Sequence, residues 1–235
     1  MDYNKAMTTL KIFIILFILM SLFHVVCIIL KKEWARRISK CLVVPLLLGV
    51  YLSGGGSRFF VIIPALILGW IGDVLLIKIQ NKTNFILGLA SFLLGHVFYI
   101  IAFIQILGIF SPEGSAGRIN IPAFIIFIPP SVVLAMVVFR LIKPTKEMYL
   151  PVFVYMTVLV TMNLFGFQVS LLYPGTAGLL ILSGCFNFIV SDTILAYYTF
   201  RKLKLSGAVL IMVYYILAQA EIIWGLLLLM RASLF

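Results

Sequence analysis

The chain has 235 residues, of which 64% are hydrophobic and only 11% charged, whereas about 25% of the residues of a soluble domain are charged. Its mean hydropathy of +1.23 excludes a soluble globular fold, because a domain of this length cannot bury so much apolar surface. The net charge of +11 is typical of basic residues that flank membrane spans, so we expect the lipid bilayer as partner and no nucleic acid.

Apolar segments separated by polar residues predict an all-α fold, a polytopic transmembrane helical bundle that forms one domain over residues 1–235. The first apolar run is longer than a signal-peptide core and no small-residue cleavage site follows it, so we expect a retained span. The second run is short and contains Pro45, and the span is expected to begin as an interfacial helix over Trp34–Lys40. The eight predicted spans are residues 12–30, 41–53, 59–78, 85–110, 121–140, 149–172, 176–200 and 207–230.

The breaks between the spans are polar or turn-forming, notably at Ser53–Ser57, Asn81–Asn84, Ser111–Gly114 and Tyr173–Gly175. Of the 18 Lys and Arg residues, five, two, three and three fall in the first, third, fifth and seventh loops. Basic residues favour the cytoplasmic side, so the pattern predicts eight spans with both termini on the non-cytoplasmic side. A seven-span chain would mix the basic loops between the two sides. We expect an integral multi-pass protein of the cell membrane in a bacterium, or of the endoplasmic reticulum in a eukaryote.

Three acidic residues, Asp73, Asp192 and Glu221, fall inside predicted spans. A carboxylate in hydrocarbon costs about 2.5–3.5 kcal/mol on insertion scales, so each is a functional candidate that should face the bundle interior. The alternative is a structural helix–helix hydrogen bond, and for Glu221 we expect a pair with Arg231 or a polar neighbour. Asp73 and Asp192 share a context of apolar residue, small residue, Asp, any residue, aliphatic residue and Leu.

Further polar residues are expected at similar depths in the cytoplasmic half of the bundle. His96 and Tyr99 lie three residues apart, and Tyr215 and Gln219 four apart, so each pair shares a helix face. We predict that these residues and Ser191 line one polar cavity with the two aspartates. Basic residues at its mouth would attract a phosphate headgroup, although topology also explains them; they are Lys78, Lys82, Arg201, Lys202 and Lys204.

Two other kinds of site are weighed for these residues. Ser191 as a nucleophile with His96 as its base lacks the Gly-x-Ser-x-Gly elbow. A metal held by His96, Asp73 and Asp192 is the second, but zinc sites usually need three or four His, Cys or carboxylate ligands and the chain has two histidines. We therefore expect no metal and no cofactor. The three cysteines are scattered, and they predict neither a disulfide framework nor a metal cluster.

Four segments in this order resemble the signature segments of the YhhN family, whose animal members include lysoplasmalogenases. They are Gly72–Leu76, Gly88–Tyr99, Ser191–Ala196 and Tyr214–Gln219. The resemblance implies a membrane-embedded hydrolase that cleaves the vinyl ether of lysoplasmalogen into a fatty aldehyde and glycerophospho-ethanolamine or -choline. The family's two aspartates fall on Asp73 and Asp192.

Two carboxylates suit this chemistry because a vinyl ether hydrolyses through protonation of carbon and an oxocarbenium ion that water traps. A buried pair that shares one proton supplies both an acid and an anion, as in glycosidases, which pass through a similar cation. His96, Tyr99, Tyr215, Gln219 and Ser191 would orient water or the lysophospholipid substrate. The main alternative is a proton-coupled transporter that uses the same acids, and a structural or lipid-binding protein is the third.

Overall fold

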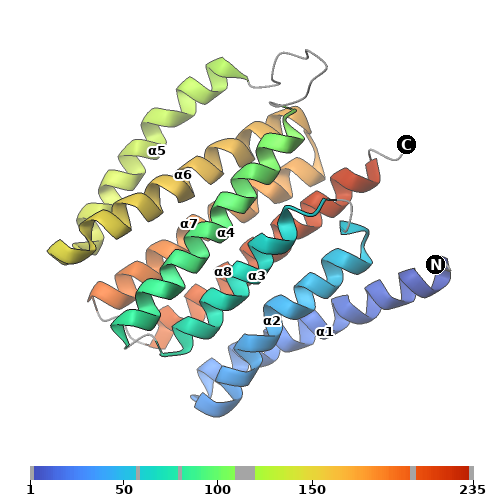
Figure 1. Ribbon diagram of the computed structural model, residues 1–235, viewed down its shortest axis with the longest axis horizontal. Coiled ribbons are helices and arrows are strands. Elements are labelled where there is room, and N and C mark those ends of the chain that lie inside the picture. The colour runs from blue at the N-terminus through green and yellow to red at the C-terminus, as the bar shows by residue number, and fades with distance from the viewer. Residues whose placement is uncertain (1–2, 57–58, 79–80, 109–119, 202–204, 233–235) are drawn as a thin grey trace. The chain divides into compact units, whose positions relative to one another are not determined.

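The computed structural model describes residues 3–56, 59–78, 81–108, 120–201 and 205–232, and the prediction of an all-α fold is confirmed (Figure 1). Two short 3₁₀ helices, η2 (Leu76–Lys78) and η3 (Lys146–Met148), accompany the α-helices. The α-helices of the described residues are α1 (Tyr3–Ile29), α2 (Glu33–Ser53), α3 (Ile62–Leu75), α4 (Lys82–Ile106), α5 (Ile121–Ile142), α6 (Tyr149–Leu172), α7 (Thr176–Arg201) and α8 (Leu205–Ala232).

The helices follow the predicted spans, with corrections at some ends. α1 begins at Tyr3, nine residues before the predicted start of the first span. The predicted helical start of the second span over Trp34–Lys40 agrees with α2, which runs unbroken from Glu33 to Ser53 through Pro45, and its placement at the membrane interface stays a prediction. At the predicted break Asn81–Asn84 the turn is shorter than expected, since α4 begins at Lys82 and the Asn81 side chain accepts from the Asn84 backbone N–H.

The other predicted breaks differ in outcome. Tyr173–Gly175 is a turn, and Gly175 has a φ of 120°, which favours glycine. At the predicted break Ser53–Ser57, Ser53 is still helical and Gly54 and Gly55 form a turn, with Gly55 at a φ of 99°, while Ser57 lies outside the described residues. Ser111–Gly114 lies outside the described residues.

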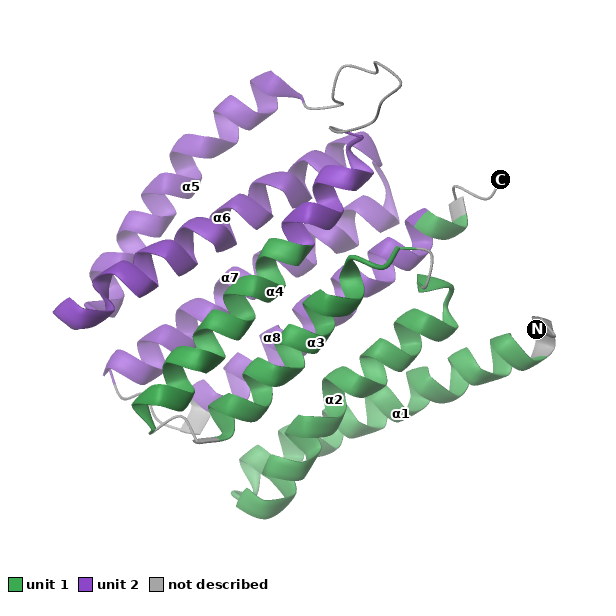
Figure 2. Cartoon of the chain, in the orientation of Figure 1, with its two compact units in different colours: residues 1–98, 230–235 green, residues 99–229 purple. Residues whose placement is uncertain are grey.

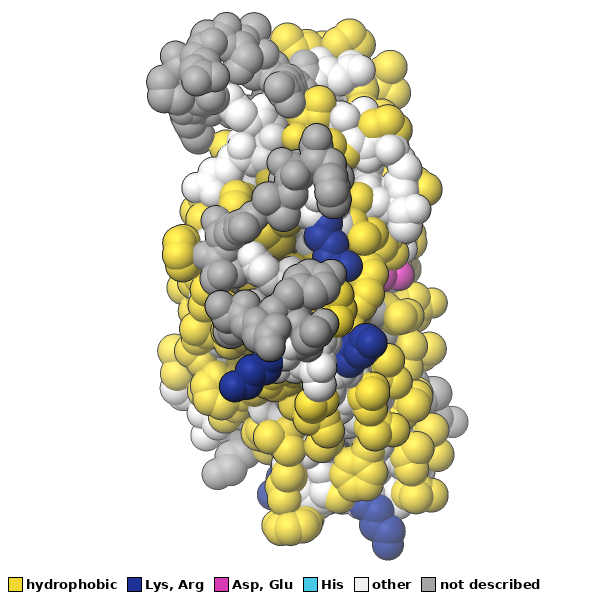
Figure 3. All heavy atoms as spheres, turned by 90° about the vertical axis from the view of Figure 1, so that its right-hand side faces the viewer, with side chains coloured by type: hydrophobic (Ala, Val, Ile, Leu, Met, Phe, Trp, Pro, Cys, Tyr) yellow, Lys and Arg dark blue, Asp and Glu magenta, His cyan; other side chains and the backbone are white. Residues whose placement is uncertain are grey.

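Among the described residues, six helices are long and apolar enough to cross a membrane, namely α1, α4, α5, α6, α7 and α8. α3 is apolar but has only 14 residues, and the N-terminal half of α2 carries charged side chains. Hydrophobic side chains dominate the face seen in Figure 3, where Lys and Arg occur at a few separate places. The lengths and compositions indicate an integral multi-pass membrane protein, and the eight-span topology with both termini outside stays a prediction.

The chain divides into two compact units (Figure 2). Unit 1 comprises residues 1–98 and 230–235, and unit 2 comprises residues 99–229, so that α4 contributes to both. The prediction of a single domain stays a prediction. Each unit has its own packed interior, and each holds one of the two aspartates singled out by the sequence.

Unit 1 is built on the packing of α1 against α2 and of α2 against α3. α1 turns a stripe of residues towards α2, with Phe17, His24 and Ile28 buried. Glycines bring α3 and α4 close together: a Cβ at Gly95 would lie 3.2 Å from the Ala65 carbonyl oxygen. Small residues allow such close approach of helices in membranes.

Unit 2 contains the end of α4 and helices α5 to α8 as far as residue 229. α7 packs on α6, and α5 packs on both of them. Glycines on α7 and α8 let these two helices approach closely, because a Cβ at Gly184 would lie 2.7 Å from the Ile222 side chain and 2.8 Å from the Ala218 carbonyl oxygen.

Candidate functional site

Asp73, on α3, is buried and paired with a cation within unit 1. Its Oδ1 lies 3.4 Å from the Nζ of Lys40 on α2, and the Asp73 and Lys40 side chains are only 3% and 11% exposed. A buried carboxylate requires a counter-charge or several hydrogen-bond donors. Lys40 therefore supplies the counter-charge that an acid inside an apolar helix needs.

Lys40 points inward because of its position on α2. It shares its face with Val43, Val44 and Leu47, which follow it by three, four and seven residues and are all buried. The sequence analysis placed Lys40 in the first loop, and this was wrong because α2 begins at Glu33. In the sequence, the spacing of the apolar residues after Lys40 is the signal that predicts its buried orientation.

Two side chain–backbone hydrogen bonds fix α3 around Asp73. Trp70 Nε1 donates to the Cys41 carbonyl oxygen of α2 at 2.9 Å. Ser91 Oγ on α4 donates to the Leu68 carbonyl oxygen at 2.6 Å. The residue before Asp73 is Gly72, where a Cβ would lie 2.7 Å from the Phe92 ring. Asp73 is thus held between α2 and α4 by neighbours on both sides.

The two histidines are both buried within unit 1. His96 Nδ1 donates to the Phe92 carbonyl oxygen at 2.7 Å, and in a neutral ring this leaves the lone pair on Nε2. His24 Nδ1 lies 2.8 Å from Ser39 Oγ, whose hydroxyl lies 2.8 Å from the Ala35 carbonyl oxygen. The His24 contact joins α1 to α2, one residue before Lys40.

In unit 2, Asp192 on α7 accepts a hydrogen bond from Tyr155 on α6. The Tyr155 hydroxyl lies 2.7 Å from Asp192 Oδ2. Tyr155 is buried, whereas Asp192 is only partly buried. A carboxyl group that is anchored by a phenol and still partly accessible can exchange a proton with a bound molecule. The sequence analysis did not identify Tyr155, because the polar residues of α6 are spread over more than one face and no pattern there marks one inward face.

Three of the predicted polar residues form a hydrogen-bonded chain in unit 2. The Tyr99 hydroxyl donates to Gln219 Oε1 at 2.6 Å, and Gln219 Nε2 lies 3.3 Å from the Tyr215 hydroxyl oxygen. The Phe188 ring packs between Tyr99 and Tyr215, with centroid distances of 6.1 and 6.0 Å. These hydrogen bonds link α4 to α8, and the Phe188 ring brings α7 into the same cluster.

Ser191 and Glu221 have partners of other kinds. Ser191 Oγ is buried and donates to the Ile211 carbonyl oxygen of α8 at 3.1 Å. Glu221 Oε2 accepts from Asn187 Nδ2 at 2.8 Å, which agrees with the expectation of a polar neighbour. Glu221 thus forms a second polar link between α7 and α8, apart from the hydrogen bonds of Asp192.

An apolar groove lies near Asp192 within unit 2. We name it the α7 groove, a space of about 500 Å³ between α5, α6 and α7, whose α7 wall runs from Leu179 through Phe186 to Ile189. Ile189 precedes Asp192 by three residues, or ~4.5 Å along the helix axis. Ligand pockets of about 300–1,000 Å³ are typical. The groove can hold a hydrocarbon chain whose polar end reaches the level of Asp192.

The basic residues predicted at the mouth differ in what the structure describes. Lys82 is exposed at the start of α4, and Arg201 is exposed at the end of α7. The Lys78 side chain and residues 202–204, with Lys202 and Lys204, lie outside what the structure describes. In the described part of the chain, no group of three or more His, Cys, Asp and Glu side chains could hold a metal ion.

Within unit 2 the structure joins Tyr99, Gln219 and Tyr215 by hydrogen bonds and, separately, Asp192 to Tyr155, while Asp73 and His96 belong to unit 1. The pairing of Asp73 with Asp192 in one cavity stays a prediction.

The helices and their internal acids define an integral, multi-pass, all-α membrane protein. The chain belongs to the YhhN family, whose family model matches residues 35–226, and the resemblance of the four sequence segments is thereby confirmed. The match covers Lys40, Asp73, Tyr155 and Asp192, whereas α1 lies outside it. No curated protein and no solved structure matches the chain.

Proposed function

We propose that this protein hydrolyses the vinyl-ether bond of lysoplasmalogen, releasing a fatty aldehyde and a glycerophospho-ethanolamine or -choline. The YhhN family includes lysoplasmalogenases. The observation that carries the proposal is the Asp192–Tyr155 hydrogen bond, which holds a partly accessible acid on α7 three residues beyond Ile189, where the α7 wall of the apolar groove ends. A single-chain lipid has the matching form, a hydrocarbon chain that ends at the bond to be cleaved.

The reaction begins with transfer of a proton to the outer carbon of the vinyl ether, which leaves an oxocarbenium ion. Water adds to this ion and loses a proton, and the resulting hemiacetal separates into aldehyde and glycerol hydroxyl. The acid must carry its proton when the lipid arrives. We assign this role to Asp192, whose hydrogen-bond partner Tyr155 is a neutral phenol. When Asp192 is protonated, one oxygen carries the proton and the other accepts the Tyr155 hydroxyl.

Asp73 is suited to the opposite role. Its neighbour Lys40 carries a positive charge 3.4 Å away, which favours the carboxylate over the neutral acid. An ionised carboxylate can stabilise an oxocarbenium ion and accept a proton from the attacking water. We propose that Asp73 acts on the same bound lipid as Asp192.

The network of Tyr99, Gln219 and Tyr215 would then bind the polar end of the lipid or the attacking water. Its hydroxyl and amide groups are fixed by one another, and such preorganisation lowers the cost of orienting a reactant. Lys78, Lys82, Arg201 and Lys202 are proposed to attract the phosphate headgroup from the membrane surface.

The test is aldehyde release by the purified protein in lipid nanodiscs. The substrates are the 1-alkenyl, 1-alkyl and 1-acyl forms of the same lysophospholipid, and we expect aldehyde from the alkenyl form alone. Asp192→Asn should lower the rate at least about 100-fold, because general acid catalysis contributes about 10²–10⁴-fold. Asp73→Asn should also lose activity.

Glu221→Gln is the matched control, because Glu221 is another acid of unit 2 that hydrogen-bonds Asn187 instead of Tyr155. It should keep nearly the full rate. Equal rates for the wild type and Asp192→Asn would refute the proposed acid, and absence of aldehyde from the alkenyl lipid would refute the proposed function. Proton-coupled uptake into liposomes without hydrolysis would favour the transporter.

A further inference from the structure

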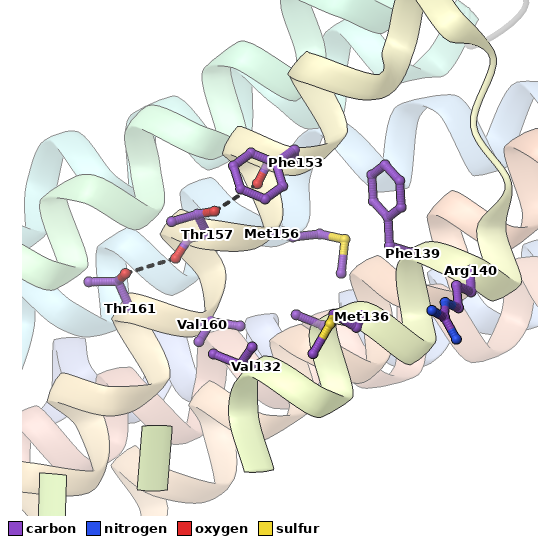
Figure 4. Close-up of a pocket in the computed structure, with 10 residues that line it drawn as sticks. Val132, Met136, Phe139, Arg140, Phe153, Met156, Thr157, Val160 and Thr161 are labelled. Carbon is purple, nitrogen blue, oxygen red and sulfur yellow. Dashed lines mark hydrogen bonds between the residues drawn. The ribbon is translucent and has the colours of Figure 1, made fainter. Parts of the chain in front are cut away.

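A second apolar groove lies between α5 and α6, within unit 2. We name it the α5–α6 groove; its volume is about 410 Å³. Figure 4 shows Val132 and Met136 of α5 opposite Met156 and Val160 of α6, with Arg140 towards one end. Methionine fills irregular apolar spaces and adapts to flexible partners. The lining is therefore suited to a hydrocarbon chain.

The α5–α6 groove faces away from the Asp192–Tyr155 pair, and it shares one lining residue, Val160, with the α7 groove. On α6 its lining residues, among them Phe153, Thr157 and Val160, centre about half a helical turn away from Tyr155. Tyr155 hydrogen-bonds Asp192 from the opposite face of the same helix. A molecule in the α5–α6 groove would therefore not contact the Asp192–Tyr155 pair.

The hydroxyls of the lining are already bonded to the backbone. Thr157 Oγ1 donates to the Phe153 carbonyl oxygen at 2.9 Å, and Thr161 Oγ1 donates to the Thr157 carbonyl oxygen at 2.8 Å (Figure 4). The charged group of the lining is Arg140, which is exposed in the last turn of α5. It forms no hydrogen bond or ion pair with any residue that the structure describes. The groove thus combines an apolar length with one available cation at its end.

The dimensions fit one leaflet of a bilayer. From Val132 to Arg140 the groove follows eight residues of α5, or ~12 Å at 1.5 Å per residue. One leaflet contributes about 15 Å of hydrocarbon, half of the ~30 Å core. Two further basic residues, Lys143 and Lys146, follow Arg140 at the same end of α5 and are exposed. An acyl chain lying along the groove would place its phosphate among these cations.

We propose that the α5–α6 groove is a binding site for an anionic diacyl phospholipid, with one acyl chain between the helices and the headgroup phosphate on Arg140. The site does not include the Asp192–Tyr155 pair and does not depend on the proposed hydrolysis. Charge complementarity at Arg140 selects an anionic headgroup. The apolar lining can accept acyl chains of different length and unsaturation.

The test uses phosphatidylglycerol with a photoreactive diazirine in one acyl chain, added to the protein in phosphatidylcholine vesicles. Cross-linked peptides are mapped by mass spectrometry, and the exposed face of α1 around Leu19 gives the background of non-specific lipid contact. We expect cross-links at Met136, Met156 and Val160 well above this background. A phosphatidylcholine probe with the same chain should give about fivefold fewer, since one basic residue near a membrane surface contributes about this factor.

Arg140→Gln should lower phosphatidylglycerol cross-linking in the groove about fivefold, whereas Lys143→Gln, which removes the same charge outside the lining, should lower it less. Val160→Trp fills the groove and should abolish its cross-links with either probe while those at Leu19 persist. The proposal is overturned by equal yields for the two probes, by no effect of Arg140→Gln, or by displacement of the probe with excess lysoplasmalogen.

Discussion

Replacement of Lys40 by Met isolates the energetic role of the buried ion pair in unit 1. At the 3.4 Å separation of Lys40 Nζ and Asp73 Oδ1, the Coulomb attraction is about 5 kcal/mol for an effective dielectric constant near 20. The cost of removing both groups from water offsets much of this attraction. Loss of one partner leaves the other charge buried, which destabilises by about 3–5 kcal/mol. We expect the destabilisation by Lys40→Met to lie at the lower end of this range, because unfolded membrane proteins also find partners for their polar groups.

The assay is unfolding of the detergent-solubilised protein by titration with a denaturing detergent, in a double-mutant cycle of Lys40→Met and Asp73→Asn. The loss of unfolding free energy in the double variant should be smaller than the sum of the two single losses by about 1–3 kcal/mol, since the two residues are in contact. Arg36→Met on the same helix is the matched control. Arg36 pairs with Glu33 at the surface, with side chains 25% and 61% exposed, and such pairs contribute about 0–1 kcal/mol. Additive losses, or a Lys40→Met loss no larger than that of Arg36→Met, would refute the reasoning.

Three further predictions concern packing, hydrogen bonding and pH. Gly184→Leu should lower the unfolding midpoint far more than Leu179→Ala on the same helix, because a Cβ at Gly184 would lie 2.8 Å from the Ala218 carbonyl oxygen whereas Leu179 is exposed. Ser39→Ala should destabilise by about 1–2 kcal/mol, measured by the same titration, through loss of the His24 contact at 2.8 Å; an unchanged midpoint would show that this contact contributes nothing. The Arg36 hydrogen bond holds the pKa of Glu33 below its ordinary value of 4.5, so its stabilisation is complete above that pH and is lost as pH falls through the lowered pKa. Glu33→Gln should remove this acid-dependent part, by less than about 1 kcal/mol, and an acid titration identical to that of the wild type would contradict the assignment.

The positions of the helices could be predicted because each apolar run is bounded by polar or turn-forming residues. A helix over Trp34–Lys40 was expected, but these charged residues do not resemble a span, and their inward face emerges only when they join the apolar residues up to Ser53. Proline within an apolar helix does not have to end it, and α2 continues through Pro45.

The two acids of the candidate site could be predicted from the sequence, but not all of their partners could. Asp73 and Asp192 were identifiable because a carboxylate in hydrocarbon is costly. Lys40 could have been found from the apolar residues at three, four and seven positions after it. Tyr155 could not, because the polar residues of α6 are spread over more than one face and a single sequence does not say which tyrosine faces α7.

The most direct measurement of the central claim is a single turnover of 1-alkenyl lysophospholipid in D₂O, with immediate reduction of the aldehyde to prevent later exchange. Proton transfer to carbon by Asp192 predicts one deuterium on the carbon next to the former aldehyde group, formed rapidly by the wild type and by Glu221→Gln, and slowed at least about 100-fold in Asp192→Asn. A product without deuterium at this carbon, or the same rate in Asp192→Asn, would contradict the account.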